Sequence, residues 1–192
     1  MTMLKSRASL LLTGFGLFAL LMMPACGSKK KAQKGEQLLE IYCSGKEYRS
    51  DKKHFRANAV GESLDQMTAR KKAMNEAKGQ LAASISTTLK SVTDNYVNSR
   101  EYNNREEVEE RFESLNREVV EQRLNNVATI CEKLTKTKEG RYKSYVAVEM
   151  DSDEIIEGYN GNVSEDERLR IDYDYEKFKE EFYKEMQRKS GS

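Results

Sequence analysis

The sequence has few of the residues from which catalytic and metal sites are commonly built. Its 192 residues include no tryptophan, one histidine, one proline and three cysteines. A single histidine excludes a histidine-based metal cluster, and a single proline excludes a proline-rich linker. The motifs G-x-S-x-G, G-x-G-x-x-G, the P-loop and H-E-x-x-H do not occur, so we expect no cofactor and no metal. We interpret His54, which follows Asp51, Lys52 and Lys53, as a surface residue at a strand start rather than as a catalytic base.

Net charge and aliphatic content are both low. The chain carries 33 Lys and Arg against 32 Asp and Glu, with the two signs interleaved. Such a chain lacks the basic surface that nucleic-acid binding requires, so we expect no nucleic-acid partner. Leu, Ile, Val and Phe make up 29 of the 167 residues that follow position 25. This supply of core residues is small, but disorder usually also requires a large net charge, so we predict a folded domain with a small core.

Residues 1–25 have the plan of a bacterial export signal. Lys5 and Arg7 precede sixteen almost wholly apolar residues, 8–23, fewer than the ~20 that span a bilayer as a helix. Ala25 then stands directly before Cys26, which resembles a bacterial lipobox. The resemblance implies that the chain is cut before Cys26 and that this residue is acylated, giving a stable membrane anchor. An ordinary cleavable signal and an uncleaved anchor are the alternatives.

Residues 26–35 are expected to form a short flexible tether after the lipid. Lys29, Lys30, Lys31 and Lys34 either touch anionic headgroups or are simply solvated. The tether is basic, and Gly27 rather than an acid follows the cysteine. By resemblance to the sorting rules of bacterial lipoproteins, these features favour the outer membrane and a side facing the periplasm.

The other two cysteines predict a disulfide. If Cys26 carries lipid, Cys43 and Cys131 remain, 88 positions apart. In the oxidising periplasm two remaining thiols are more often paired than free. No C-x-x-C motif supports a redox role, and two cysteines with one histidine supply too few ligands for a metal. The bond would attach the N-terminal extended segment to the first strand of a hairpin.

The hydrophobic pattern predicts one α+β domain over residues 36–192. We expect an extended segment at 36–50, a strand at 54–61, and a helix at 64–98 that Ser63 caps together with Gln66. A second helix, capped by Asn104, precedes a hairpin at 126–136 and 141–150. A helical turn near 152–156, a loop at 158–162 and a helix at 164–189, capped by Ser164, follow.

The small residues of the first helix and the tyrosines of the last quarter each predict a mode of packing. Ala69, Ala73 and Ala77 lie one turn apart, so the first helix can approach the sheet closely, whereas a membrane-binding helix would place bulky residues there. On the hairpin, alternation places Val127, Thr129 and Cys131 on one face. The tyrosines of the last quarter are expected to substitute for aliphatic residues in the core, with a partner surface as the alternative. The apolar stripe expected on the first helix comprises Met67, Ala73, Met74, Ala77, Leu81, Ile85, Leu89, Val92 and Tyr96.

Three stretches of this pattern resemble a known family. They are residues 55–63, residues 69–85 with their alanines, and the closing strand at 143–149. Together they look like the LPP-type twenty-kilodalton envelope lipoproteins, to which domains of flagella-associated outer-membrane proteins are related. The similarity covers roughly residues 41–150. It implies a strand, a long helix and a small antiparallel sheet in a lipoprotein without catalytic activity, and it transfers no catalytic residue; the helix after Gly161 exceeds the family's usual core.

Three functions are compatible with these features. The leading hypothesis is a non-enzymatic, lipid-anchored envelope protein that binds an unknown envelope partner or has a structural role. The alternative is a carrier that encloses a small ligand in an apolar cavity between the sheet and the long helix. The third is an enzyme directed at the cell wall, which would require a catalytic carboxylate pair, and no two carboxylates stand out from the many in the chain.

Overall fold

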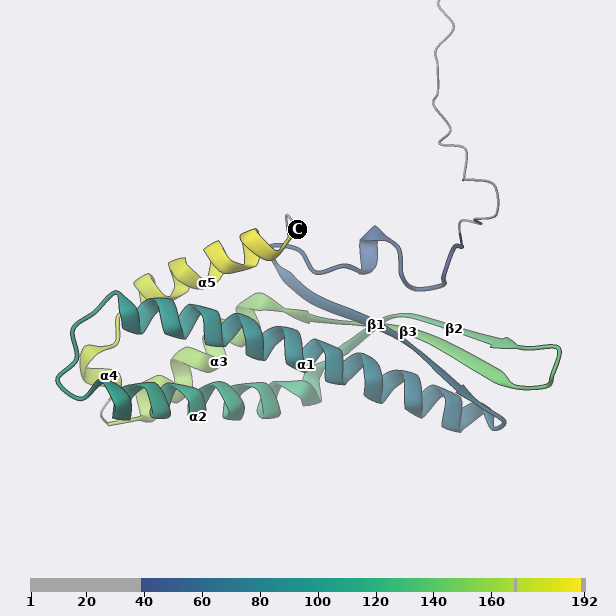
Figure 1. Cartoon of the computed structure of the whole chain (residues 1–192), viewed down its shortest axis with the longest axis horizontal. Helices are drawn as coiled ribbons and strands as arrows, with labels where there is room; N and C mark the ends of the chain where they lie inside the picture. The colour runs from purple at the N-terminus through teal and green to yellow at the C-terminus, as the bar shows by residue number, and fades with distance from the viewer. Residues whose placement is uncertain (1–38, 168, 191–192) are drawn as a thin grey trace, which may run out of the picture. The chain divides into compact units, whose positions relative to one another are not determined.

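The computed structural model describes residues 39–167 and 169–190, and the residues from Leu39 onward form one compact unit. The predicted signal and tether at 1–35 lie outside the described residues. The elements are η1 (Lys46–Tyr48), β1 (His54–Ser63), α1 (Gln66–Asn98), α2 (Arg105–Arg123), η2 (Leu124–Asn126), β2 (Ala128–Lys136), β3 (Tyr142–Asp151), α3 (Ser152–Glu165), α4 (Leu169–Asp172) and α5 (Tyr175–Ser190). The α+β class is confirmed (Figure 1). A short 3-10 helix, η1, interrupts the segment that was expected to be extended.

The three strands form an antiparallel sheet in the order β1-β3-β2. β1 alternates as predicted, because Phe55, Ala57 and Ala59 are buried on one face. Their direct partners Met150, Val148 and Val146 on β3 are buried on the same face. This inner face packs on α1. The opposite, outer face carries the residues between them.

α1 packs on this sheet through small residues. Ala69, Ala73 and Ala77 are fully buried, and a Cβ on Gly61 of β1 would lie 2.2 Å from the Ala69 carbonyl oxygen. The backbones therefore touch, which only small side chains permit. Of the stripe predicted on this helix, the residues from Ala73 to Tyr96 are buried or partly buried as expected, but Met67 is exposed.

The start of α1 differs from the prediction. Asp65, not Ser63, is the N-cap, and its carboxylate accepts a hydrogen bond from the Thr68 N–H at 2.8 Å. Asp65 directly precedes the helix, so its carboxylate can accept from the free N–H groups of the first turn. Ser63 is still part of β1 and cannot serve in the same way. Ser63 instead accepts from the Asp65 N–H. Asn104 is the N-cap of α2 as predicted, although its side chain donates to Glu107 and not to the backbone.

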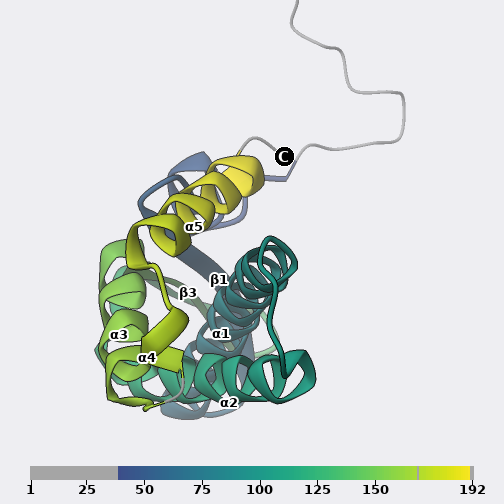
Figure 2. The same ribbon diagram turned by 90° about the vertical axis from the view of Figure 1, so that its left-hand side faces the viewer.

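The C-terminal half of α1 lies beyond the sheet, where it packs on α2 and α5, while α3 packs on α2 (Figure 2). Aromatic rings fill the interior between these helices. Tyr159 stacks on Phe178 with the ring centroids 4.5 Å apart, and Tyr96 meets Phe112 and Phe178 edge to face. Burial raises the pKa of the Tyr159 hydroxyl, against a hydrogen bond with Thr93 that lowers it. The expectation for the tyrosines of the last quarter is confirmed for Tyr159, whereas Tyr173, Tyr175 and Tyr183 are only partly buried against the core.

The helical turn expected near 152–156 is present as the start of α3, but the prediction for the residues that follow was wrong. The expected loop at 158–162 is helical, because α3 runs through both Gly158 and Gly161. Burial of Tyr159 stabilises this helix despite the glycines, and Gly158 gives Arg123 room, since a Cβ there would meet its guanidinium at 2.5 Å. Ser164 caps nothing; its hydroxyl donates to the Asn160 carbonyl inside α3.

The single helix predicted at 164–189 is instead divided into the end of α3, the short α4 and α5. Asp166 ends α3 and accepts from the Leu169 N–H, which opens α4. Asp174 accepts from the Lys177 N–H at the start of α5, while the Asp174 N–H donates to the buried Tyr96 hydroxyl at 2.7 Å. Each aspartate offers the backbone an alternative partner, so the chain turns there.

The hairpin is where it was predicted, with a β-bulge that the alternation did not reveal. Thr129 pairs with Val148 and Cys131 with Ala147, so Ile130 is the extra residue. Thr129 therefore lies on the inner face and Cys131 on the outer face. The expectation that they share a face was wrong, because one inserted residue reverses the alternation.

We predict that Gly61→Ala destabilises the fold. The new methyl group would meet backbone atoms of α1 that cannot move aside, at a cost of about 1–3 kcal/mol in urea-induced unfolding. Gly79→Ala is the matched control, because nothing lies within 4 Å of the place that its methyl group would take on α1. That change should be neutral or stabilise by up to ~1 kcal/mol. Equal stability of the two variants would contradict the close contact of helix and sheet.

Candidate functional site

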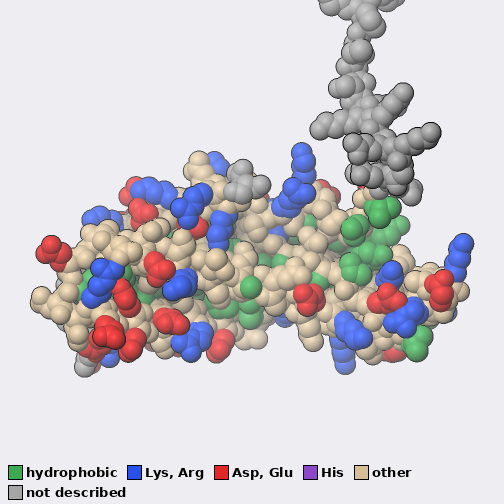
Figure 3. Space-filling view, viewed as in Figure 1, with side chains coloured by type: hydrophobic (Ala, Val, Ile, Leu, Met, Phe, Trp, Pro, Cys, Tyr) green, Lys and Arg blue, Asp and Glu red, His purple; other side chains and the backbone are tan. Residues whose placement is uncertain are grey.

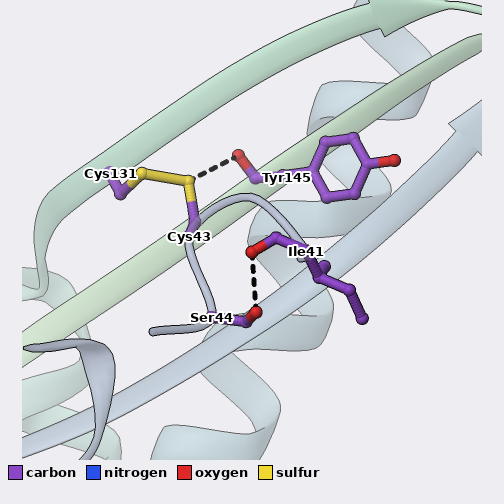
Figure 4. Close-up of a disulfide and its surroundings, with 5 residues drawn as sticks. All are labelled: Ile41, Cys43, Ser44, Cys131 and Tyr145. Atoms are coloured by element: carbon purple, nitrogen blue, oxygen red, sulfur yellow. Dashed lines mark hydrogen bonds between the residues drawn. A yellow bond between two sulfur atoms is a disulfide. The ribbon is translucent and has the colours of Figure 1, made fainter. Parts of the chain in front are cut away.

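The chain from Leu39 to Ser50 lies against the outer face of the sheet and is bonded to it covalently. The Sγ atoms of Cys43 and Cys131 are 2.10 Å apart and their Cα atoms 5.6 Å apart, which confirms the predicted disulfide (Figure 4). The bond joins the N-terminal segment to β2 as expected. Cys26, the predicted lipidation site, lies outside the described residues.

The turn that presents Cys43 to the sheet is held in an uncommon conformation. Cys43 has a φ of 56°, a left-handed value that side chains other than glycine seldom adopt. The Ser44 hydroxyl donates to the Ile41 carbonyl at 2.8 Å and closes the turn. Cys43 is buried, and its sulfur lies 3.6 Å from the Tyr145 carbonyl oxygen of β3 (Figure 4). The disulfide and these contacts together maintain a backbone that would otherwise relax.

A polar cluster attaches the same segment at its other end. Arg56 of β1 bonds Glu149 of β3 through Nε, and through Nη1 it bonds Asp51 at 2.7 Å and the Arg49 carbonyl at 3.0 Å. The Ser50 hydroxyl accepts from the Arg56 N–H and donates to the Arg56 carbonyl. Because both Arg56 backbone groups bond to Ser50, the segment covers this part of the free β1 edge.

Hydrogen bonds control the charge of Asp51 in this cluster. Burial alone would raise its pKa, but the N–H groups of Lys53 and His54 and the Arg56 guanidinium bond its carboxylate. Together they outweigh burial and lower the pKa of Asp51 from 3.8 to about 2. Asp51 is therefore ionised at neutral and mildly acidic pH.

The cluster contains the residue types of a hydrolytic triad but not its geometry. His54 Nδ1 lies 3.2 Å from Asp51, while the Ser50 hydroxyl is occupied by both backbone groups of Arg56. A nucleophile needs its base within hydrogen-bonding reach. Here serine and arginine secure the segment to the strand, so the arrangement is that of a structural clamp.

Acidic side chains line an open groove of about 470 Å³ between α1 and α2. Glu106, Glu109, Glu110 and Glu113 contribute carboxylates, and Asn116 lies at its base with a hydrogen bond to Thr93 at 3.3 Å. Lys90 and Arg117 also line the groove, so its charge is partly balanced. Within the described ranges, no three or more His, Cys, Asp or Glu side chains come together as a metal site.

The apolar cavity that a carrier would need was expected between the sheet and α1. Those two elements are instead in direct contact, with Ala73, Ala77 and Leu81 fully buried. The groove described above lies elsewhere, between two helices, and is lined mostly by polar and charged residues with Val97 among them. A hollow does lie along β1 and α1, beside Glu62 and Lys72, but it is an open surface rather than an enclosed cavity.

Comparisons with known proteins identify no relative. A scan against models of protein families finds no match, and a search of curated proteins finds no similar sequence. None of the described helices combines the length and the hydrophobicity that crossing a bilayer requires.

Sequence reasoning found the disulfide and missed the clamp. Arg56 was assigned no role from the sequence. Its ion-pair partner Glu149 is 93 positions away, and nothing local marks the two as opposite each other. The one available signal was the alternation itself, which places Arg56 on the outer face of β1 and Glu149 on the outer face of the hairpin strand.

Removing either cysteine of the disulfide should lower stability, and removing both should lower it no further. We predict that Cys43→Ser and Cys131→Ser each reduce the free energy of unfolding by about 2–5 kcal/mol, because the unfolded chain regains the freedom of an 88-residue loop. The double variant should lose no more than either single variant, and a reductant should bring the wild type to the same value. Additive losses would indicate two separately buried thiols instead.

Because Asp51 is part of the clamp, we predict that the stability of the protein depends on pH in the acidic range. The folded-state pKa of Asp51 is depressed, so its contribution is fully present above pH 4 and is lost as the pH falls towards 2. Its side chain is 47% exposed, and screening limits the effect to at most ~1 kcal/mol. Unfolding measured from pH 5 to pH 2 should show a flatter curve for Asp51→Asn than for wild type. Parallel curves would show that the carboxylate contributes nothing.

Proposed function

We propose that the protein is a lipoprotein of the bacterial envelope, anchored through an acylated Cys26. The observation that carries the proposal is the pairing of Cys43 with Cys131. The chain has three cysteines, so this pairing leaves Cys26 as the one without a disulfide partner. That residue stands at the end of an apolar export signal, directly after Ala25, where a lipobox places its acylated cysteine.

The disulfide also supports the compartment. Structural disulfides persist in the periplasm and are rare in the reducing cytosol. Cys43 is buried and its bond closes a long loop, which is typical of a structural rather than a catalytic disulfide. We therefore place the folded domain on the exported side of the membrane, and by the sorting rules of lipoproteins at the outer membrane, facing the periplasm.

Within the envelope we propose a non-enzymatic role, in structure or in binding a protein partner. The only histidine is engaged with Asp51 and Arg56 in the clamp, and Ser50 is bonded to the β1 backbone. The resemblance of residues 41–150 to LPP-type envelope lipoproteins supports the same role. The strand, the long helix and the small sheet expected from that resemblance are the elements β1, α1 and the sheet.

Cys26→Ser should abolish acylation. In cells grown with a fatty-acid analogue, we expect the wild-type protein to be labelled and to fractionate with membranes. The variant should be unlabelled and either released or left as an uncut precursor, because only a thiol at that position accepts the lipid.

Cys43→Ser is the matched control, since it removes another cysteine while leaving the lipobox intact. It should retain the label. Labelling that persists in Cys26→Ser would show that a different residue is acylated, and the proposal would then fail.

A further inference from the structure

Exposed apolar side chains gather where the described chain begins (Figure 3). Leu39, Ile41 and Tyr42 of the segment are exposed, as is Val60 on the outer face of the sheet, and the half-buried Tyr145 lies beside Val60 on that face. We call these five residues the apolar patch. Tyr42 packs edge to face on Tyr145 at 5.3 Å, and Tyr145 is the direct cross-strand partner of Val60. The patch is therefore continuous across the segment and two strands.

The patch is a fixed surface. The disulfide at Cys43 is adjacent in sequence to Tyr42, and the hydroxyl of Ser44 holds the Ile41 carbonyl. An apolar segment of this kind would ordinarily fold its side chains inward. Here the left-handed turn at Cys43 directs the cysteine into the sheet while Ile41 and Tyr42 stay more than half exposed. Apolar side chains that are held in place and stay exposed together favour an interaction surface.

Covalent geometry limits how far the patch can lie from the proposed anchor. Leu39 follows Cys26 by thirteen residues, which span at most about 45 Å when fully extended. A lipid on Cys26 thus holds the patch at a high effective concentration near the bilayer, so that even a weak affinity for it suffices.

We propose that the apolar patch docks on the phospholipid surface in which Cys26 is anchored, an inference that rests on the proposed lipoprotein function. Tyr42 and Tyr145 have the apolar ring and polar hydroxyl that favour the interface between acyl chains and headgroups. The charges around the patch are of both signs, with Lys133 opposite Tyr145 and with Glu40 and Glu47 in the segment. Apolar contact rather than charge attraction therefore holds the domain, with the outer face of the sheet towards the bilayer.

The absence of tryptophan makes this orientation measurable, because one introduced tryptophan is the only such fluorophore. Tyr42→Trp places it in the patch, and Met67→Trp places it on α1, the helix that covers the inner face of the sheet. The two positions are equally exposed, at 56% and 53%. The acylated full-length proteins are reconstituted into phosphatidylethanolamine and phosphatidylglycerol vesicles that contain lipids brominated on the acyl chain. We expect emission from Tyr42→Trp to fall roughly twice as much as that from Met67→Trp, with little change at high salt.

A second variant separates docking from anchoring. Ile41→Asn in the Tyr42→Trp protein should reduce the quenching, while flotation with the vesicles and thermal unfolding stay unchanged. Equal quenching at the two positions, or stronger quenching in Met67→Trp, would overturn the docking proposal and leave the lipoprotein function standing, provided that the protein floats and carries the acyl label. If protection of the Tyr42→Trp emission from the quencher rises with protein concentration, the patch binds a second copy of the protein. That result would also overturn the docking proposal. A protein that neither floats nor is labelled would overturn both.

Discussion

The contact between α1 and the sheet is the constraint on which the remaining structure depends. Gly61 and the alanines of α1 bring the two backbones together, which fixes the direction of a helix of 33 residues. That helix is about 50 Å long and extends well past the sheet. Its second half supplies a surface against which α2 and α5 pack, and α3 packs in turn on α2, so one close contact positions both halves of the core.

Aromatic residues compensate for the small supply of aliphatic ones. The interior beyond the sheet is built on Tyr96, Phe112, Tyr159 and Phe178, whose large rings each bury more surface than a valine would. The two tyrosine hydroxyls also serve as hydrogen-bond partners: Tyr96 accepts from the backbone at the start of α5, and Tyr159 lies 3.5 Å from the hydroxyl of Thr93. The same residues thus provide packing and set the position of helix ends.

The features that depend on local sequence could be predicted, and those that depend on contacts between distant residues could not. β1, α1, α2 and the hairpin have periodic local patterns, and the disulfide followed from counting cysteines and expecting an exported domain. The helix α3 did not follow, because burial of Tyr159 overrides two glycines whose local preference is for a loop. The bulge at Ile130 and the Arg56–Glu149 pair depend on strand register, which no local pattern reveals.

The placement of the disulfide determines how the domain responds to mechanical load. Tension that reaches Cys43 along the preceding chain divides between the following peptide and the sulfur bridge to β2. Without the bridge, a pull would peel the segment away one hydrogen bond at a time, beginning with the clamp at Ser50 and Asp51. With it, the load also enters β2, which is paired along its length with β3. The cross-link therefore distributes a pull on the segment over a hydrogen-bonded strand as well as over the clamp.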